Sequence, residues 1–229
     1  MAIPESVILK ILRAKEHYDT FVAEMHGEFQ SHAGRLVVEI DPFSNSVRQT
    51  FTAPLPPRFA LIVGDCLDNL RSALDFVVWE LVLAANGVPS EKNTFPVCDA
   101  PRSFKDATRS RLSGLTPKMI TEIDLMQPYR RGNDLRSHPL WCLNKLANVN
   151  KHRRVLLVSV HADWAGKLIG TDRYTLAAPG SKMHVDIHPA AYVALNEREI
   201  VQGAPDVSSV VSQLISEVER LMPNFQQFF

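Results

Sequence analysis

The chain has 229 residues and a formal net charge of zero, because 25 basic side chains balance 25 acidic ones. It therefore lacks the broad positive field that draws a protein onto nucleic acid or an anionic membrane, although a local basic patch is compatible with this balance. Hydrophobic residues make up 45% and charged residues 22%, which is typical of a globular protein with a sizeable core.

Cysteine usage and the N-terminus both bear on the compartment. Cys66, Cys98 and Cys142 lie far apart and form no CxxC pair, which favours reduced thiols over a disulfide framework or a zinc cage. The N-terminus has no signal-peptide pattern, and no stretch has the length of a membrane span. We therefore expect a cytoplasmic protein without membrane contact. Since GxGxxG and P-loop motifs are absent, no nucleotide cofactor is expected.

Periodicity and turn composition predict the order of elements. Helices are expected at 5–31, 57–86, 102–112, 117–127, 138–153 and 206–222, a hairpin within 35–53, and antiparallel strands within 154–196. Asn86-Gly87 is expected to close the second helix, and Ser137 is the candidate cap of the helix over 138–153. The fold class predicted is α+β in a single domain over 1–229. In this prediction a helical bundle adjoins one antiparallel sheet, which the hairpin and the later strands form together.

The helix over 57–86 has an apolar stripe and, opposite it, an unusual polar one. The apolar stripe is expected in the core and comprises Val63, Leu67, Leu70, Leu74, Val77, Val78 and Leu81. The polar stripe comprises Asp65, Asp68, Asn69, Arg71, Ser72 and Asp75, together with Phe76 and Trp79. Exposed aromatics leave apolar area uncovered, so we expect this stripe to be shielded as a site or an interface. A solvated face with weak surface ion pairs is the alternative.

The helix over 138–153 carries a polar arc that could face this stripe. If the two arcs meet, they bring together an acid, a base and fixed cations, which suit proton transfer or phosphate binding. The candidate catalytic residues are Arg71 and His152. The candidate binding residues are Asp65, Asp68, Asn69, Ser72, Asp75, Asn144, Asn148 and Lys151. A structural hydrogen-bond network that only positions two helices is the alternative.

Two segments carry a resemblance to a known set of proteins. They are GDCLDNLRSALDFVVWELV at 64–82 and HPLWCLNKLANVNKHR at 138–153, with TFP at 94–96 between them. Together they resemble a widespread family of uncharacterised bacterial proteins with a GDxxxNLRSALDHxxW helix and a later PLWxLxxLxNxDKHR helix. The resemblance covers most of the chain up to residue 155 and implies architecture more readily than activity.

The same helix is similar to the Arg-x4-His signature of HEPN-type proteins, many of which are metal-independent ribonucleases. In that family the Arg stabilises the scissile phosphate, the His takes part in proton transfer, and two protomers commonly combine their sites. Arg71 and Ser72 match the start of the signature, but Phe76 stands at the His position. The resemblance therefore implies a homodimer that binds RNA or cleaves it weakly, with His152 as the substitute proton-transfer group.

A third hypothesis concerns metal. His184, Asp186 and His188 alternate along an expected strand, and these residue types suit zinc or iron. Three ligands spread along one straight strand do not converge on one ion, so no bound metal is expected. The hypotheses are thus a HEPN-like RNA-binding protein, a non-catalytic dimerisation or interaction module, and a metal-dependent enzyme.

Overall fold

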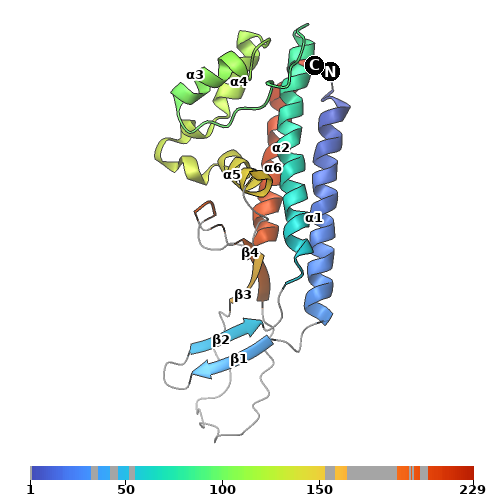
Figure 1. Cartoon of the computed structure of the whole chain (residues 1–229), viewed down its shortest axis with the longest axis vertical. Coiled ribbons are helices and arrows are strands. Elements are labelled where there is room, and N and C mark those ends of the chain that lie inside the picture. Colours follow the sequence, from blue (N-terminus) through green and yellow to red (C-terminus); the bar gives the residue numbers. More distant parts are fainter. Residues whose placement is uncertain are drawn as a thin grey trace, which may run out of the picture.

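The computed structural model of the chain describes residues 2–31, 36–41, 46–51, 55–152, 158–163, 190–195, 197, 199–201 and 206–229. Helices dominate this part of the chain (Figure 1). The helices are α1 Glu5–Ser31, α2 Arg58–Ala84, α3 Pro101–Ser110, α4 Pro117–Leu125, α5 Pro139–His152, α6 Val207–Phe225 and the 3-10 helices η2 Pro128–Ser137 and η3 Gln226–Phe228. The strands are β1 Leu36–Asp41, β2 Ser46–Phe51, β3 Val158–Asp163 and β4 Ala190–Leu195.

Three long helices form the body of the molecule. Helices α1, α2 and α6 run side by side as a bundle, and α5 packs against both α2 and α6 (Figure 1). The apolar stripe predicted on α2 is confirmed as core, since every member from Val63 to Leu81 is at most 1% exposed. At the lower end of the bundle the rings of Phe21 and Phe59 meet edge to face, with centroids 5.7 Å apart. No described helix combines the length and the apolar character that crossing a membrane requires.

The predicted α+β class is wrong. The four strands form two separate antiparallel pairs, β1 with β2 and β3 with β4, and the hairpin does not join the later strands in one sheet. Helices supply almost all of the core residues whose side chains the structure describes, and Val193 and Leu195 of β4 join them there. The expected hairpin forms, and strands lie at 158–163 and 190–195, while most of the expected strand region 154–196 lies outside the described residues. Alternation specifies a strand and not its partner in a sheet.

Two helix ends show how local chemistry sets the boundaries. Helix α2 stops at Ala84, and Asn86 adopts a left-handed φ of 58°, a conformation that asparagine tolerates after a helix. At the start of α5 the predicted cap is wrong. The amide of Leu140 donates to Nδ1 of His138 over 3.1 Å, whereas the Ser137 hydroxyl donates to the carbonyl oxygen of Asp134 over 2.8 Å.

Helices α2 and α5 approach one another closely at Gly64. A Cβ added at Gly64 would lie 2.5 Å from Oδ1 of Asn150, so only a glycine admits the asparagine at this point. Asn150 in turn donates to Oδ2 of Asp68 over 3.1 Å. Asp68, one member of the polar stripe on α2, therefore faces α5.

Candidate functional site

A polar groove lies where α2, α5 and the segment between α2 and α3 meet. Its volume is about 540 Å³, and its lining comprises Arg71, Asp75, Glu91, Lys92, Thr94, Val97, Ser110, Arg111, Asn144, Asn148 and Lys151. A neighbouring hollow of about 500 Å³ is lined by Val97, Cys98, Asp99, Ser103, Asp106, Ala107, Ser110, Arg111, Asn144 and Lys145. Because the two share Arg111 and three further lining residues, they adjoin one another, and we call them together the Arg111 groove.

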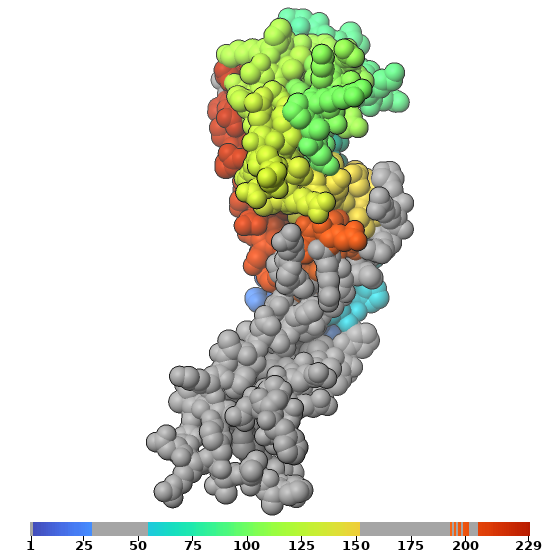
Figure 2. Space-filling model, turned by 90° about the vertical axis from the view of Figure 1, so that its left-hand side faces the viewer, coloured from blue at the N-terminus to red at the C-terminus, as the bar shows by residue number. Residues whose placement is uncertain are grey.

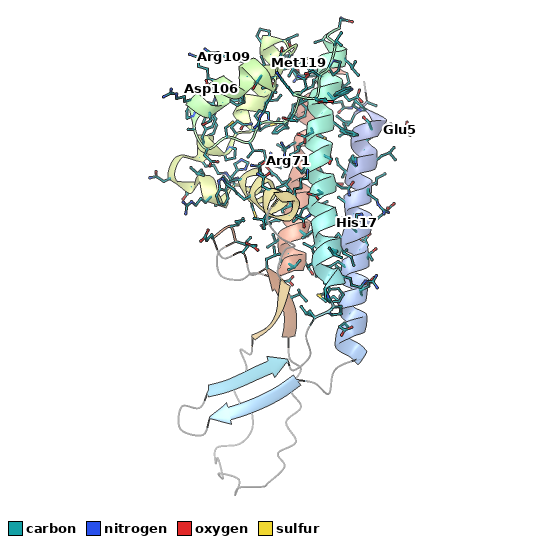
Figure 3. The ribbon with its side chains drawn as sticks, in the orientation of Figure 1. Glu5, His17, Arg71, Asp106, Arg109 and Met119 are labelled. Atoms are coloured by element: carbon teal, nitrogen blue, oxygen red, sulfur yellow. The ribbon has the colours of Figure 1, made fainter. Side chains whose placement is uncertain are left out.

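At the floor of the Arg111 groove, Arg71 and Asp75 clamp the backbone of Phe95. Nη2 of Arg71 donates to the carbonyl oxygen of Phe95 over 2.5 Å, and the amide of Phe95 donates to Oδ1 of Asp75 over 2.8 Å. Nη1 of Arg71 lies 3.0 Å from the same carboxylate oxygen and forms an ion pair with it. This nitrogen is buried, and its geometry does not allow a hydrogen bond. Arg71, 8% exposed, therefore lies inside the fold between α2 and α5 (Figure 3).

Burial dominates the electrostatics of this ion pair. It lowers the pKa of Arg71, against the opposing effect of Asp75, and it raises the pKa of Asp75. Arg71, the Phe95 amide, Lys151 and Arg111 all oppose that rise of the Asp75 pKa. Three cations therefore converge on one carboxylate, and the guanidinium stays protonated near neutral pH.

Two further buried amides hold the groove wall in place. Asn93, 6% exposed, accepts from the amide of Ser90 over 2.7 Å and donates to the carbonyl oxygens of Arg111 and Ser113. Its side chain thus ties the start of the wall to the segment that follows α3. These hydrogen bonds of one buried amide hold the irregular segment in place.

Gln127 performs the same role at the other end of the wall. It is fully buried, donates to the carbonyl oxygen of Pro96 over 3.0 Å and accepts from the amide of Cys98 over 3.0 Å. Residues 90–98 form the wall of the groove. Side chains from α2, from the wall itself and from the turn after α4 hold this wall in place.

The remaining polar residues of the α2 stripe divide between two neighbours. Toward α5, Asp68 contacts Asn150 and lies 3.9 Å from Nζ of Lys151. Toward α1, Oδ1 of Asn69 accepts from Lys10 over 3.4 Å, while its amide donates to the carbonyl oxygen of Asp65. Asp65 itself is exposed.

Ser72 and the two aromatics do not contribute to the Arg111 groove. The Ser72 hydroxyl bonds the backbone of Asp68, one turn earlier in α2. Phe76 and Trp79 are 38% and 42% exposed, so the described part of the chain does not provide the cover that was expected for them. Nζ of Lys10 lies 5.6 Å from the centroid of the Phe76 ring, on the α1 side of the helix.

The structure brings five of the predicted site residues together in the Arg111 groove: Arg71, Asp75, Asn144, Asn148 and Lys151. The side chain of His152 lies outside the described part of the chain, and so do His184, Asp186 and His188. Lys92 was missed because it lies in the irregular segment before α3, and Arg111 was missed because it ends a short expected helix that carried no recognised motif. Among the described residues, no three histidine, cysteine, aspartate or glutamate side chains are placed to share a metal ion.

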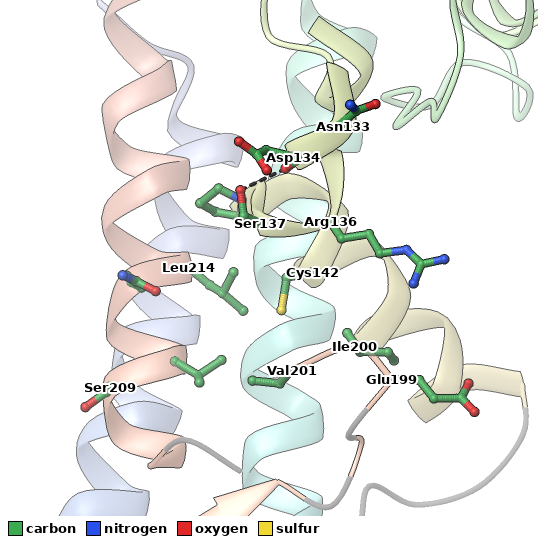
Figure 4. A pocket seen from close by; sticks show the side chains of 13 residues that line it. Asn133, Asp134, Arg136, Ser137, Cys142, Glu199, Ile200, Val201, Ser209 and Leu214 are labelled. Carbon is green, nitrogen blue, oxygen red and sulfur yellow. Dashed lines mark hydrogen bonds between the residues drawn. The ribbon is translucent and has the colours of Figure 1, made fainter. Parts of the chain in front are cut away.

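A separate cavity of about 620 Å³ lies between η2, α5 and α6 (Figure 4). Cys142, Val201 and Leu214 give it an apolar floor, and Asp134, Arg136 and Glu199 contribute charges of both signs around it. Burial raises the pKa of the Cys142 thiol to about 11, so the thiol stays protonated and is a poor nucleophile at neutral pH.

Comparison of the chain with protein-family models, with curated proteins and with solved structures finds no match.

Proposed function

We propose that this chain is a HEPN-like protein that binds RNA without cleaving it, by holding phosphate groups in the Arg111 groove. The observation that carries the proposal is the gathering of Lys92, Arg111 and Lys151 around a groove that also presents the amides of Asn144 and Asn148. Cations and amide donors are the groups that bind nucleic-acid backbones. The resemblance to HEPN-type proteins supports RNA as the source of these phosphates.

The two cations that the sequence did not single out are free to take a ligand. In the described part of the chain, the side chains of Lys92 and Arg111 form no ion pair or hydrogen bond, and both residues are exposed. A phosphate can therefore bind to either side chain without displacing a hydrogen bond or ion pair within the described residues. The guanidinium of Arg111 suits bidentate contact with phosphate oxygens.

The geometry of α2 argues against catalysis by the HEPN pattern. Arg71 is committed to Phe95 and Asp75, so it is closed to a scissile phosphate. Phe76, at the His position of the signature, faces Lys10 of α1. Arg71 therefore places a positive charge beneath the groove, and it holds the backbone of the groove wall at Phe95.

The test is a titration of labelled single-stranded RNA with wild type and with Arg111→Gln/Lys151→Gln, in EDTA and at several salt concentrations. Loss of two phosphate contacts should lower the slope of log affinity against log salt by about 1.4. Arg13→Gln/Lys15→Gln on α1 is the matched control, since both cations are exposed and remote from the groove. Absence of binding by wild type, or equal losses in both variants, would reject the proposal.

A second candidate function, a dimerisation module, is favoured by the exposed apolar patch on α2. Phe76, Trp79 and Leu83 are 38%, 42% and 47% exposed at i, i+3 and i+7, and we call them the Phe76 patch. We propose that a second copy of the chain covers it. Lys10 and Glu80 border the same side of the patch, so a twofold pairing can bring the lysine of one copy toward the glutamate of the other.

Sedimentation velocity at tens of micromolar protein tests this pairing. Wild type should sediment as a dimer, and Trp79→Lys should sediment as a monomer. Leu125→Lys is the control, because Leu125 is 59% exposed on α4, outside the patch. A monomeric wild type would exclude the dimer while leaving the RNA proposal intact.

A further inference from the structure

We propose that the outer face of α3 extends the Arg111 groove into a track for the phosphate backbone of an RNA longer than the groove. This inference rests on the proposed function of the groove. It adds a surface that the motif resemblance does not include, and it predicts which RNA lengths that surface recognises.

Helix α3 and the residue after it are strongly basic, although the chain as a whole is neutral. Segment 101–111 contains four basic residues, Arg102, Lys105, Arg109 and Arg111, and one acidic residue, Asp106. Spacings of three and four residues place Arg102, Lys105 and Arg109 on one face of the helix. All three are exposed, and the opposite face buries Phe104 and Ala107.

This basic face continues directly from the groove. Ser103, Ala107 and Ser110 on the neighbouring edge of α3 line the hollow that shares Arg111 with the rest of the groove. Asp106 and Arg109 project from α3 on the side away from the bundle (Figure 3). Figure 2 looks onto the surface that α3, α4 and η2 form. From Arg102 to Arg109 the helix rises about 10.5 Å, so the face adds room for several phosphates.

The cations of this face are weakly engaged within the chain. The one ion pair formed by the described residues of α3 joins Arg109 to Asp106 at 3.9 Å, and both side chains are more than half exposed, at 72% and 65%. Such a pair contributes little to stability, so a phosphate can displace it. No described residue that lines the groove is aromatic, so base stacking adds nothing there. Binding should therefore be strongly salt-dependent and insensitive to base sequence.

The experiment compares a trinucleotide with an RNA of about 15 nucleotides. Each is titrated with wild type and with Arg102→Gln/Lys105→Gln/Arg109→Gln. Glutamine keeps the helix propensity of the replaced residues, and circular dichroism checks that the variant folds. We expect the variant to bind the longer RNA at least about tenfold more weakly, with a salt slope lower by about 2, and to bind the trinucleotide as wild type does.

Each outcome has a definite meaning. Unchanged binding of the longer RNA, or equal losses for both RNAs, overturns the track while the groove proposal stands. Failure of wild type to bind either RNA overturns the proposed function itself.

A substitution of opposite sign gives an independent check. Asp106→Asn removes the only acidic side chain of segment 101–111. It should tighten binding of the longer RNA severalfold, because the basic face then meets the phosphates without an acidic neighbour. A loss of affinity for the longer RNA in this variant would contradict the track.

Discussion

The guanidinium of Arg71 donates to the backbone carbonyl oxygen of Phe95 over 2.5 Å and thereby joins α2 to the wall of the groove. The carboxylate of Asp75 accepts from the amide of the same residue, so both backbone groups of Phe95 depend on one ion pair. Removing one member leaves a buried charge and a buried carbonyl without partners. We expect Arg71→Ala to lower the free energy of unfolding by about 3 kcal/mol in urea titrations.

Arg111→Ala separates this structural role from binding. Arg111 is exposed and its side chain has no partner in the part of the chain described, so its loss should change stability by less than about 0.5 kcal/mol. The same variant should weaken RNA binding. If Arg71→Ala proved as stable as Arg111→Ala, the hydrogen bonds of Arg71 and Asp75 to Phe95 would not contribute to the free energy of unfolding.

The close approach of α2 and α5 predicts that replacing a helical glycine by alanine lowers stability, which is the opposite of the usual effect. Glycine to alanine inside a helix normally stabilises by about 1 kcal/mol. At Gly64 the new Cβ would lie 2.5 Å from Asn150, so the asparagine must move and its bond to Asp68 is strained. We expect Gly64→Ala to lower the melting temperature.

Gly27 in α1 provides the matched control, because a Cβ there has nothing within 4 Å. Gly27→Ala should raise the melting temperature. Combining Gly64→Ala with Asn150→Ala should recover part of the loss, which a double-mutant cycle measures as a coupling energy. Stabilisation by Gly64→Ala alone would show that α5 does not pack on α2 in this way.

His138 predicts how stability depends on pH. Nδ1 of the neutral ring accepts the amide of Leu140 and caps α5, an arrangement that protonation of Nδ1 abolishes. Burial, helped by Arg131 and Arg220 against Glu217, lowers the pKa of His138 from 6.5 to about 4. As the pH falls, the unfolded chain binds this proton before the folded chain does. The stabilisation that the neutral His138 cap provides is therefore fully present above pH 6.5. It is lost as the pH falls toward 4, by at most about 3 kcal/mol.

His138→Asn is the comparison, since asparagine can cap a helix but does not titrate. Denaturant titrations between pH 4 and 8 should show a smaller acid-induced loss in this variant than in wild type. Identical pH profiles would mean that His138 is not the neutral cap of α5.

Catalysis offers a further prediction. Phe76 faces Lys10 on the α1 side, and Arg71 faces the groove wall, so a histidine at position 76 cannot act with Arg71 on one phosphate. We expect Phe76→His to leave labelled single-stranded RNA intact in EDTA. Cleavage by this variant that disappears on adding Arg71→Ala would instead identify a degenerate ribonuclease.

The part of the site that the sequence predicted is the part built from two regular helices. Helical periodicity places Arg71 and Asp75 on one face of α2, and it places Asn144, Asn148 and Lys151 on one arc of α5. Once two amphipathic helices pack, their polar arcs can meet only where their apolar faces stop. Pattern reasoning therefore found five lining residues of the groove.

The remaining features depend on contacts that no periodicity encodes. Lys92 and Arg111 reach the groove because the buried amides of Asn93 and Gln127 fix the wall through long-range hydrogen bonds to the backbone. The sheet prediction failed for a related reason: alternation identifies strands, whereas their pairing depends on tertiary contacts. His138 was missed as a cap because serine is the commoner cap and stands next to it.

The most direct test of phosphate binding in the Arg111 groove is an amide and side-chain NMR titration of the ¹⁵N-labelled chain with a trinucleotide RNA. The account predicts saturable shifts of the Asn144 and Asn148 side-chain amides and of the Arg111 Nε–H, with the Trp79 indole unmoved. Shifts confined to Trp79 and its neighbours, or no saturable shift at all, would contradict it.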